Sequence, residues 1–192
     1  MNPHKFFVGR AVGFLIVIVI VVTAYFIYTS LPHAPEEESN GEQASTVYTD
    51  DYKSIAYTIE GKEVLLTDGY AEVETAPGSA SKTVTKYFGN EAMGDLNGDG
   101  SPDVAFLLTQ DGGGSGTFYY VVVALRKGAG YVGTNAVLLG DRIAPQTTEI
   151  HDGVLVVNYA DRGPDEPMTA KPTIGVSSYL HVEGGILSEN RN

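Results

Sequence analysis

The strongest pattern along the chain is an uncharged, mostly apolar stretch from Ala11 to Leu31, with an unbroken run of large apolar residues at positions 14–22. At ~1.5 Å rise per residue, a helix of this length spans about 30 Å, which is the hydrocarbon thickness of a bilayer. Backbone groups in lipid must hydrogen-bond within their own segment, so a helix is expected although many of the residues are β-branched. The sequence therefore predicts a transmembrane helix at 11–31.

The charges on either side of this segment predict its orientation. Lys5 and Arg10 precede it, and three consecutive glutamates follow it at positions 36–38. Because basic flanks stay on the cytoplasmic side, residues 1–10 are predicted to be a cytoplasmic tail and the chain beyond the helix to be extracytoplasmic. The alternative is a secretory signal peptide cleaved after Ala34, although the apolar run is longer than such peptides have. We expect an uncleaved anchor and a single-pass membrane protein.

A polar stretch, PHAPEEESNGEQAS at positions 32–45, follows the apolar segment. It contains two prolines, four glutamates and no large apolar residue, so it buries too little surface to fold. We predict a disordered, flexible linker that holds an extracytoplasmic domain, residues 46–192, away from the membrane.

The pattern after the linker is one of short strands separated by turns. In residues 54–59, Ile55, Tyr57 and Ile59 occupy alternate positions, which is typical of a strand with one buried face. Two runs are continuously apolar and are predicted to be central strands, at 104–108 and 118–125. Further strands are predicted at 63–66, 70–74, 83–88, 135–139, 149–150, 154–159 and 176–182.

Turn residues and the lack of helical periodicity indicate the fold class. Glu60-Gly61, Asp152-Gly153 and Glu183-Gly184-Gly185 supply residues that tolerate positive φ between strands. No window after the anchor has sustained helical spacing, and no fixed internal repeat is present. We predict a mainly β domain, an antiparallel sandwich or a small barrel, preceded by one N-terminal transmembrane helix.

Composition narrows the chemistry of this domain. The net charge of the chain is −12, and residues 1–33 contain two bases and no acid, so the remainder carries a net charge of −14. Such a domain repels phosphate backbones, and we predict no nucleic-acid partner. The chain has no cysteine, which excludes disulfides, thiolate zinc sites and cysteine nucleophiles.

One acidic segment, DLNGDGSPD at 95–103, carries specific chemistry. Oxygen-bearing side chains occupy its positions 1, 3, 5 and 9, and position 6 is glycine. This spacing lets alternate residues surround a hard cation, the glycine permits the sharp turn, and the backbone carbonyl at position 7 adds another oxygen. We therefore predict a Ca²⁺ site with the ligands Asp95, Asn97, Asp99, Ser101 and Asp103.

The predicted ligand set is incomplete as an EF-hand. Phe106 stands at position 12 in place of the bidentate glutamate, so water or a remote carboxylate such as Glu91 or Asp111 must complete the shell. A modest dissociation constant follows, on the order of 10⁻⁴ to 10⁻³ M. The alternative is a plain Asx-rich turn between strands, which needs no metal. The register of all four side-chain oxygens favours the metal.

The segment from Gly94 to Val104 resembles the calcium loops of FG-GAP and VCBS-type repeats of extracellular β-proteins, although this chain has one copy. A longer stretch resembles a family of uncharacterised bacterial secreted or membrane-anchored β-domains. It includes GDLNGDGSPDVAFLL, GGGSGTFYYVVVAL, LLGDRI and NYADRGPDEP. The resemblance implies an extracytoplasmic location and Ca²⁺, and it implies neither a reaction nor catalytic residues.

Three hypotheses of function follow. The leading one is a non-catalytic, Ca²⁺-stabilised module for binding or envelope organisation, attached to the membrane by its helix and facing an unidentified protein or glycan partner. The second is a cell-wall or glycan hydrolase that uses loop carboxylates, with Asp111, Asp165 and Glu166 as candidates. The third is an inhibitor or regulator that uses the tip at Gly112–Gly116. That glycine-rich tip lacks the following helix of a phosphate loop or nucleophile elbow, and we interpret it as a hairpin connection.

Overall fold

The computed structural model describes residues 49–189, and its regular elements there are β-strands. The predicted cytoplasmic tail, transmembrane helix and linker lie outside these residues. Within residues 49–189, no helix is long and apolar enough to cross a membrane. The strands are β1 (Ala56–Ile59), β2 (Lys62–Leu65), β3 (Tyr70–Glu74), β4 (Lys82–Gly94), β5 (Asp103–Asp111), β6 (Phe118–Lys127), β7 (Gly130–Gly133), β8 (Val137–Asp141), β9 (Ala144–His151), β10 (Val154–Asp161), β11 (Ile174–Glu183) and β12 (Ile186–Glu189).

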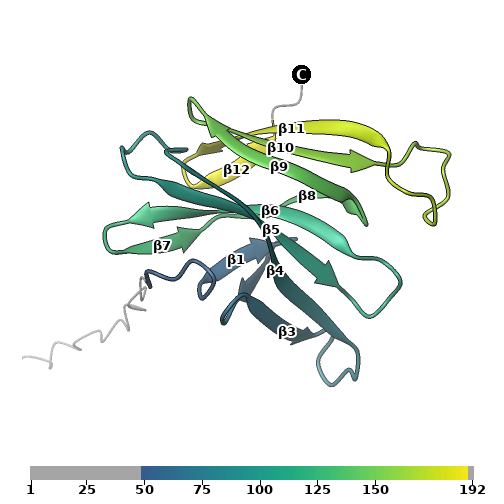
Figure 1. Cartoon of the computed structure of the whole chain (residues 1–192). Helices are drawn as coiled ribbons and strands as arrows, with labels where there is room; N and C mark the ends of the chain where they lie inside the picture. The colour runs from purple at the N-terminus through teal and green to yellow at the C-terminus, as the bar shows by residue number, and fades with distance from the viewer. Residues whose placement is uncertain (1–48, 190–192) are drawn as a thin grey trace, which may run out of the picture. The chain divides into compact units, whose positions relative to one another are not determined.

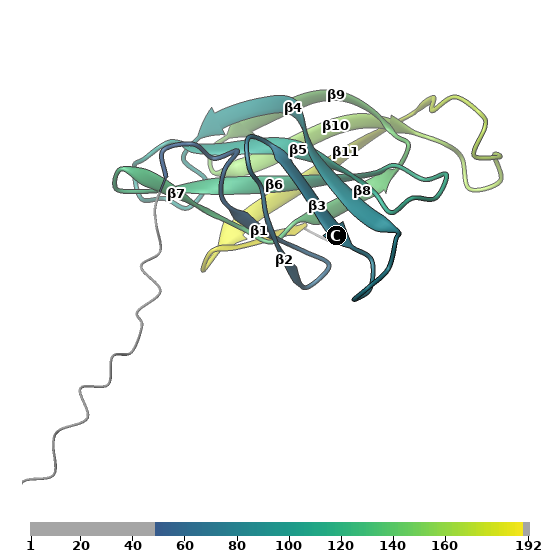
Figure 2. The same ribbon diagram turned by 90° about the horizontal axis from the view of Figure 1, so that it is seen from below.

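The strands form three antiparallel sheets (Figure 1). The largest has the order β3-β4-β5-β6-β7, with β8 also paired to β6, and it curls like half of a barrel. A four-stranded sheet, β12-β11-β10-β9, covers one of its faces, and the β1–β2 hairpin lies on the other (Figure 2). The prediction of a mainly antiparallel β domain is thereby confirmed.

The two apolar runs form the middle of the largest sheet because both of their faces are buried. Ala105, Leu107, Val121 and Val123 face the four-stranded sheet and belong to one hydrophobic core with residues of β10 and β11. Their neighbours along the strands point the other way and form a second core with the β1–β2 hairpin, to which they contribute Val104, Phe106, Leu108, Tyr120, Val122 and Ala124. A continuous apolar sequence is the signature of such a doubly covered strand.

Strand β4 continues beyond the predicted segment 83–88, because it bends and then continues as a strand to Gly94. Its register with β5 shifts between Tyr87 and Ala92, where Gly89 and Asn90 have positive φ. The part beyond the bend lies on β9. The Asn90 side chain donates to Thr148 Oγ1 at 3.0 Å, and a Cβ added to Gly94 would lie 2.6 Å from Ile150 Cγ2. β4 therefore links the two larger sheets.

The turns agree with the prediction, and two short strands were not predicted. Glu60-Gly61, Asp152-Gly153 and Gly184-Gly185 have positive φ at both positions and connect antiparallel neighbours. Strands β7 and β12 did not appear in the pattern, because each has four residues and β7 is half glycine. They form edges of the largest and the four-stranded sheet, respectively.

Candidate metal-binding loop and a neighbouring groove

The acidic segment 95–103 is the connection between β4 and β5 and leads from Gly94 to Asp103, which pair with each other across the ladder. Gly98 and Gly100 have φ of 77° and 82°, a region that disfavours side chains, so glycine is required at both turns. Leu96 is 4% exposed and inserts into the core between the two larger sheets. One apolar side chain thus fixes a loop that is otherwise polar.

Asp95 organises the first half of the loop. Its Oδ1 accepts hydrogen bonds from the backbone N–H groups of Gly98 (2.8 Å) and Asp99 (3.2 Å), and its Oδ2 accepts one from Gly100 (2.8 Å). Three consecutive amides therefore point at one carboxylate. A carboxylate held in this way is preorganised, because its position does not depend on a bound ion.

Asn97 and Asp99 repeat this arrangement further along the loop. Asn97 Oδ1 accepts from the Asp99 N–H at 2.9 Å, and Asp99 Oδ1 accepts from the Ser101 N–H at 2.9 Å. The Asn97 amide also donates to Asp99 Oδ2 at 3.1 Å. The hydrogen bond from Ser101 lowers the pKa of Asp99 and outweighs the effect of desolvation. Asp99 therefore remains ionised at neutral pH.

Asp103 is the buried end of the loop, with no solvent exposure. Its Oδ2 accepts from the Leu96 N–H at 3.0 Å, and its Oδ1 accepts from the Arg126 N–H at 2.8 Å. Burial raises the pKa of Asp103, the two N–H donors oppose that rise, and the charges of Asp99 and Asp95 increase it. Asp103 thus joins the loop to β6.

A lysine that the loop motif does not contain also reaches the site. Lys127 Nζ lies 3.9 Å from Asp99 Oδ2, at the end of β6 beside the turn to β7. Both side chains are partly solvent-exposed, so the ion pair adds little stability. It nevertheless places a positive charge beside the predicted cation site, and this charge would compete with Ca²⁺.

The chemistry of the donors fits Ca²⁺, whereas the arrangement is that of a loop closed on its own amides. Every side-chain acceptor here is a hard oxygen, and a carboxylate oxygen that accepts one N–H keeps a second lone pair, whereas Asp95 Oδ1 already accepts two N–H groups. Among residues 49–189, no group of three or more His, Cys, Asp or Glu side chains is arranged to hold a metal ion. Asp95, Asn97, Asp99 and Asp103 would hold Ca²⁺ through their remaining lone pairs, together with the Ser101 carbonyl.

Glu91 and Asp111, the two remote carboxylates suggested to complete the Ca²⁺ coordination, lie in other environments. Glu91 Oε1 accepts a hydrogen bond from Tyr52 at 2.5 Å and a further one from the Tyr87 hydroxyl. Asp111 ends β5 at the strand terminus opposite Asp103, roughly 25 Å away at the rise of a β-strand. Because of this distance along β5, Asp111 is excluded as a ligand of this loop.

The carboxylates suggested for a hydrolase are used locally. Asp111 Oδ1 accepts from the Gly113 N–H at 2.8 Å, and Glu166 Oε2 accepts from the Gly163 N–H at 2.7 Å. Neither they nor Asp165 line the two cavities described below. Each of the two bonded carboxylates stabilises its own turn.

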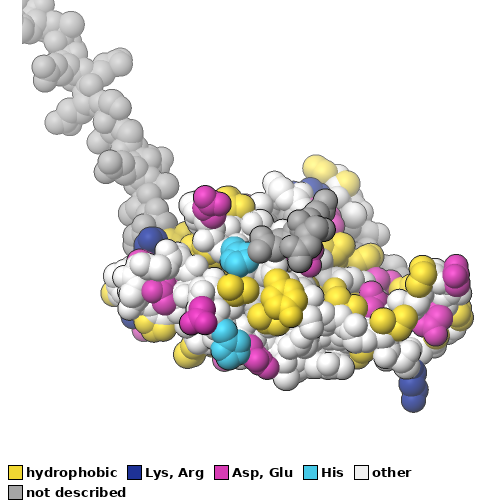
Figure 3. Space-filling model, turned by 90° about the horizontal axis from the view of Figure 1, so that it is seen from above, with side chains coloured by type: hydrophobic (Ala, Val, Ile, Leu, Met, Phe, Trp, Pro, Cys, Tyr) yellow, Lys and Arg dark blue, Asp and Glu magenta, His cyan; other side chains and the backbone are white. Residues whose placement is uncertain are grey.

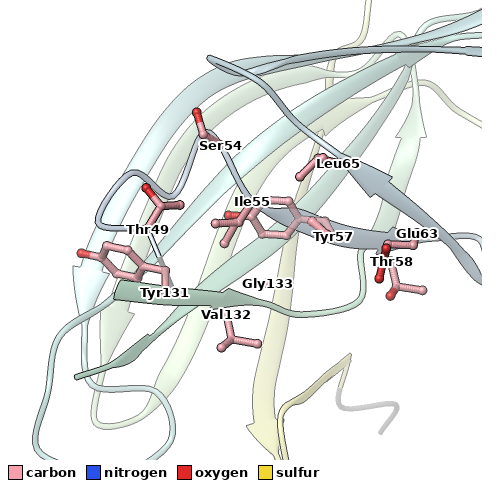
Figure 4. Close-up of a pocket in the computed structure, with 11 residues that line it drawn as sticks. Thr49, Ser54, Ile55, Tyr57, Thr58, Glu63, Leu65, Tyr131, Val132 and Gly133 are labelled. Atoms are coloured by element: carbon pink, nitrogen blue, oxygen red, sulfur yellow. The ribbon is translucent and has the colours of Figure 1, made fainter. Parts of the chain in front are cut away.

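An open groove, which the sequence did not predict, lies between β1 and β7 (Figure 4). Its volume is about 450 Å³, and a smaller cavity of about 150 Å³ lies between the β1–β2 hairpin and β3–β4. Glu63 is the one carboxylate of the groove lining, which has no His, Lys or Arg. The lining residues are Thr49, Ser54, Ile55, Ala56, Tyr57, Thr58, Glu63, Leu65, Tyr131, Val132 and Gly133.

Close backbone contacts hold β1 beside β7 along the groove. Thr58 bonds to the segment after β7, donating to the Thr134 carbonyl at 3.2 Å and accepting from the Ala136 N–H at 2.7 Å. Gly133 touches β1 so closely that an added Cβ would lie 2.1 Å from the Ala56 carbonyl oxygen. This contact between strands distant in sequence left no signal in the local pattern.

Comparisons with known proteins found no matching family model, no matching curated protein and no matching solved structure.

Proposed function

We propose that this chain is a membrane-anchored, extracytoplasmic binding module whose β-domain is stabilised by Ca²⁺ at the loop 95–103. The predicted helix at 11–31 supplies the anchor. The module is non-catalytic and presents its sheets to a partner at the envelope of a bacterial cell.

The observation that carries the calcium proposal is the position of Asp103. Asp103 has no solvent exposure, and burial together with the charges of Asp99 and Asp95 raises its pKa. Negative charges on one loop repel one another, and a divalent cation relieves that repulsion. Because Asp103 bonds to the backbone of β6, Ca²⁺ held there would stabilise the junction of β4, β5 and β6.

The lining of the larger β1–β7 groove supports a binding role rather than hydrolysis, whereas the smaller cavity is lined by Glu60, Glu63 and Glu74. General acid–base hydrolysis of a glycan needs a pair of carboxylates, and this groove has one. Its other side chains are aliphatic, aromatic or hydroxyl-bearing. Such a lining can hold a ligand and orient it, but it offers no second group for proton transfer.

The test is thermal unfolding of the full chain in neutral detergent, followed by the circular dichroism of its β-sheets, with Ca²⁺ or with a chelator. A specific site adds ~2.7 kcal/mol at a Ca²⁺ concentration of 100 times Kd. For a domain of this size the expected rise in Tm is roughly 5 to 10 °C. With a Kd on the order of 10⁻⁴ to 10⁻³ M, 100 times Kd is about 10 to 100 mM, and an unchanged Tm at about 100 mM Ca²⁺ would overturn the calcium proposal.

Two variants make the test specific. Asp99→Ala removes an exposed carboxylate at position 5 of the loop and is expected to abolish the Ca²⁺-dependent rise in Tm. Lys127→Ala removes the competing ammonium and is expected to tighten Ca²⁺ binding a few-fold. Equal Ca²⁺ responses in Asp99→Ala and the parent chain would assign the effect to another part of the molecule.

A further inference from the structure

The four-stranded sheet β9–β12 buries one face and leaves the other outside the core. Leu155 on β10 and Leu180 on β11 are fully buried against the six-stranded sheet. Because side chains alternate along a strand, the residues next to them point outward. Figure 3 looks onto this outward surface, which we call the outer β9–β12 face.

The outer β9–β12 face has an unusual charge pattern. None of its four strands contains a lysine or an arginine. Glu149 on β9 and Glu183 on β11 are exposed carboxylates, and the Lys and Arg side chains visible in Figure 3 lie toward the edges. The contact between Glu149 and His151, which are 3.0 Å apart, lowers the pKa of Glu149, so this carboxylate is ionised at neutral pH.

Exposed apolar side chains accompany both carboxylates. Tyr179 is 52% exposed, and the strand register places it in one row with Val156 and Glu149. In this row Glu149 and Tyr179 are two strands apart, or about 10 Å. Ile186 is 59% exposed and pairs directly with Glu183 on the neighbouring strand. Each carboxylate thus lies beside an apolar surface.

The row between these two contains His151 on β9 and His181 on β11. On the other side of the Glu149–Tyr179 row, the polar side chains bond to one another. Asn158 donates from its amide nitrogen to Thr147 Oγ1 at 2.9 Å, and its amide oxygen accepts from Ser177 Oγ at 2.6 Å. Both ends of the amide are therefore used within the sheet.

We propose that the outer β9–β12 face binds a basic segment of a partner protein. An arginine or lysine of that segment lies over the Tyr179 ring and pairs with Glu149, and a second basic side chain pairs with Glu183 beside Ile186. Guanidinium and ammonium groups are attracted to both carboxylates and aromatic faces. The aliphatic stems of the same side chains cover Val156 and Ile186. This inference specifies the partner of the binding module proposed above and rests on that role.

Charge disfavours two other occupants of the face. A second copy that docked through the same face would bring the same carboxylates against it, and an anionic lipid surface would be repelled likewise. A neutral glycan is not repelled by these charges. The experiment below therefore distinguishes a glycan partner from a basic peptide partner.

The test measures fluorescence anisotropy of a labelled peptide that alternates arginine and valine, titrated with the full chain in neutral detergent. Substituting Glu149→Gln and Glu183→Gln together, or Tyr179→Ser alone, is expected to weaken binding about tenfold or less, and added salt weakens binding to the parent chain. The matched controls are Glu72→Gln and Tyr70→Ser on β3, which replace exposed residues of the same kinds on another sheet. They are expected to bind as the parent chain does.

A charge exchange makes the result specific. The double variant Glu149→Lys, Glu183→Lys is expected to lose the arginine–valine peptide and to bind one that alternates glutamate and valine. Equal binding by this variant and the parent, or equal loss in the β3 controls, would overturn the proposal. Binding of an uncharged oligosaccharide that depends on Tyr179, without binding of the basic peptide, would overturn it in favour of a glycan.

The outcome is independent of the calcium experiment, because the peptide is titrated both with Ca²⁺ and with chelator. Peptide binding without a Ca²⁺ effect on Tm would support the proposed site on the outer β9–β12 face and reject the proposed Ca²⁺ site. A Ca²⁺ effect without peptide binding retains the metal and rejects the face.

Discussion

Tyr52 donates its hydroxyl hydrogen to Glu91 across 2.5 Å, and this bond ties the segment before β1 to the bent part of β4. Lys53 strengthens the contact, since its Nζ lies 3.7 Å from Glu91 Oε1 and 4.2 Å from the centre of the Tyr87 ring. The Tyr52 ring packs against Phe106 in the core beneath. One carboxylate thus fastens two segments that are 39 residues apart in sequence.

Removing the hydroxyl in Tyr52→Phe is expected to lower the free energy of unfolding by about 1 kcal/mol, because the ring still packs while a charge-assisted bond is lost. Urea unfolding of the full chain measures the change. Tyr70→Phe is the matched control: its hydroxyl also bonds to a carboxylate, Glu72, but within one exposed strand. If both variants lost the same stability, the Tyr52 bond would have no special role between segments.

The same contact predicts a dependence of stability on acid. Partial burial alone raises the pKa of Glu91, but bonds from Tyr52 and Tyr87 and the charge of Lys53 outweigh it and lower the pKa from its usual 4.5. A carboxylate with a lowered folded-state pKa stabilises the fold above its unfolded pKa, and the contribution is lost as pH falls through the folded pKa. The stability advantage of the parent over Glu91→Gln should therefore shrink below about pH 4.5.

Urea unfolding at a series of pH values measures this advantage. The exposed Glu63→Gln on β2 serves as the control and is expected to follow the parent profile. An advantage over Glu91→Gln that stayed constant down to about pH 3 would contradict the assignment.

A second pH-dependent prediction concerns the ionisation of Tyr87 at alkaline pH. Desolvation, and then the bond to Glu91, raise the pKa of Tyr87 from 10.0 to about 12. The neutral phenol is thus favoured in the fold, and its contribution is complete below pH 10 and lost as pH rises through 12. Ultraviolet titration of the folded chain should lose an ionisation near pH 12 in Tyr87→Phe, whereas Tyr179→Phe should retain it.

Local patterning reveals this fold where burial is regular along one strand. The run Val121-Val122-Val123 alternates between two cores, and its unbroken apolarity predicts a central strand. The pattern fails in β4 because positive φ at Gly89 and Asn90 interrupts the alternation. The sheet order and the β1–β7 groove were inaccessible because they depend on contacts between distant strands.

For the acidic loop, too, the sequence predicts the local turn but not the contacts with other strands. Its spacing locates the turn, and the positive φ of Gly98 and Gly100 agrees with the motif. The hydrogen bond from the Arg126 N–H to Asp103, like the approach of Lys127 to Asp99, joins the loop to another hairpin. No spacing within residues 95–103 encodes these contacts.

Asp103 should stabilise the domain even without Ca²⁺. Asp103→Ala leaves the N–H groups of Leu96 and Arg126 without their acceptors, and an unsatisfied buried donor costs about 1 to 3 kcal/mol. We expect a loss of about 3 kcal/mol in chelator, measured by urea unfolding. Asp99→Ala, which removes an exposed carboxylate of the same loop, should lose less than about 1 kcal/mol in chelator. A loss below about 1 kcal/mol in Asp103→Ala would show that its two N–H bonds add little stability without the metal.

The contact between Gly133 and Ala56 should tolerate no side chain. In Gly133→Ala the new Cβ would lie 2.1 Å from the Ala56 carbonyl oxygen and 2.7 Å from the Tyr57 ring, so β1 must move off β7. We expect a loss of about 3 kcal/mol in urea unfolding. Gly112→Ala is the control, because nothing lies within 4 Å of its added Cβ, and its effect should stay within about 1 kcal/mol. Equal stability of the two variants would mean that β1 is free to separate from β7.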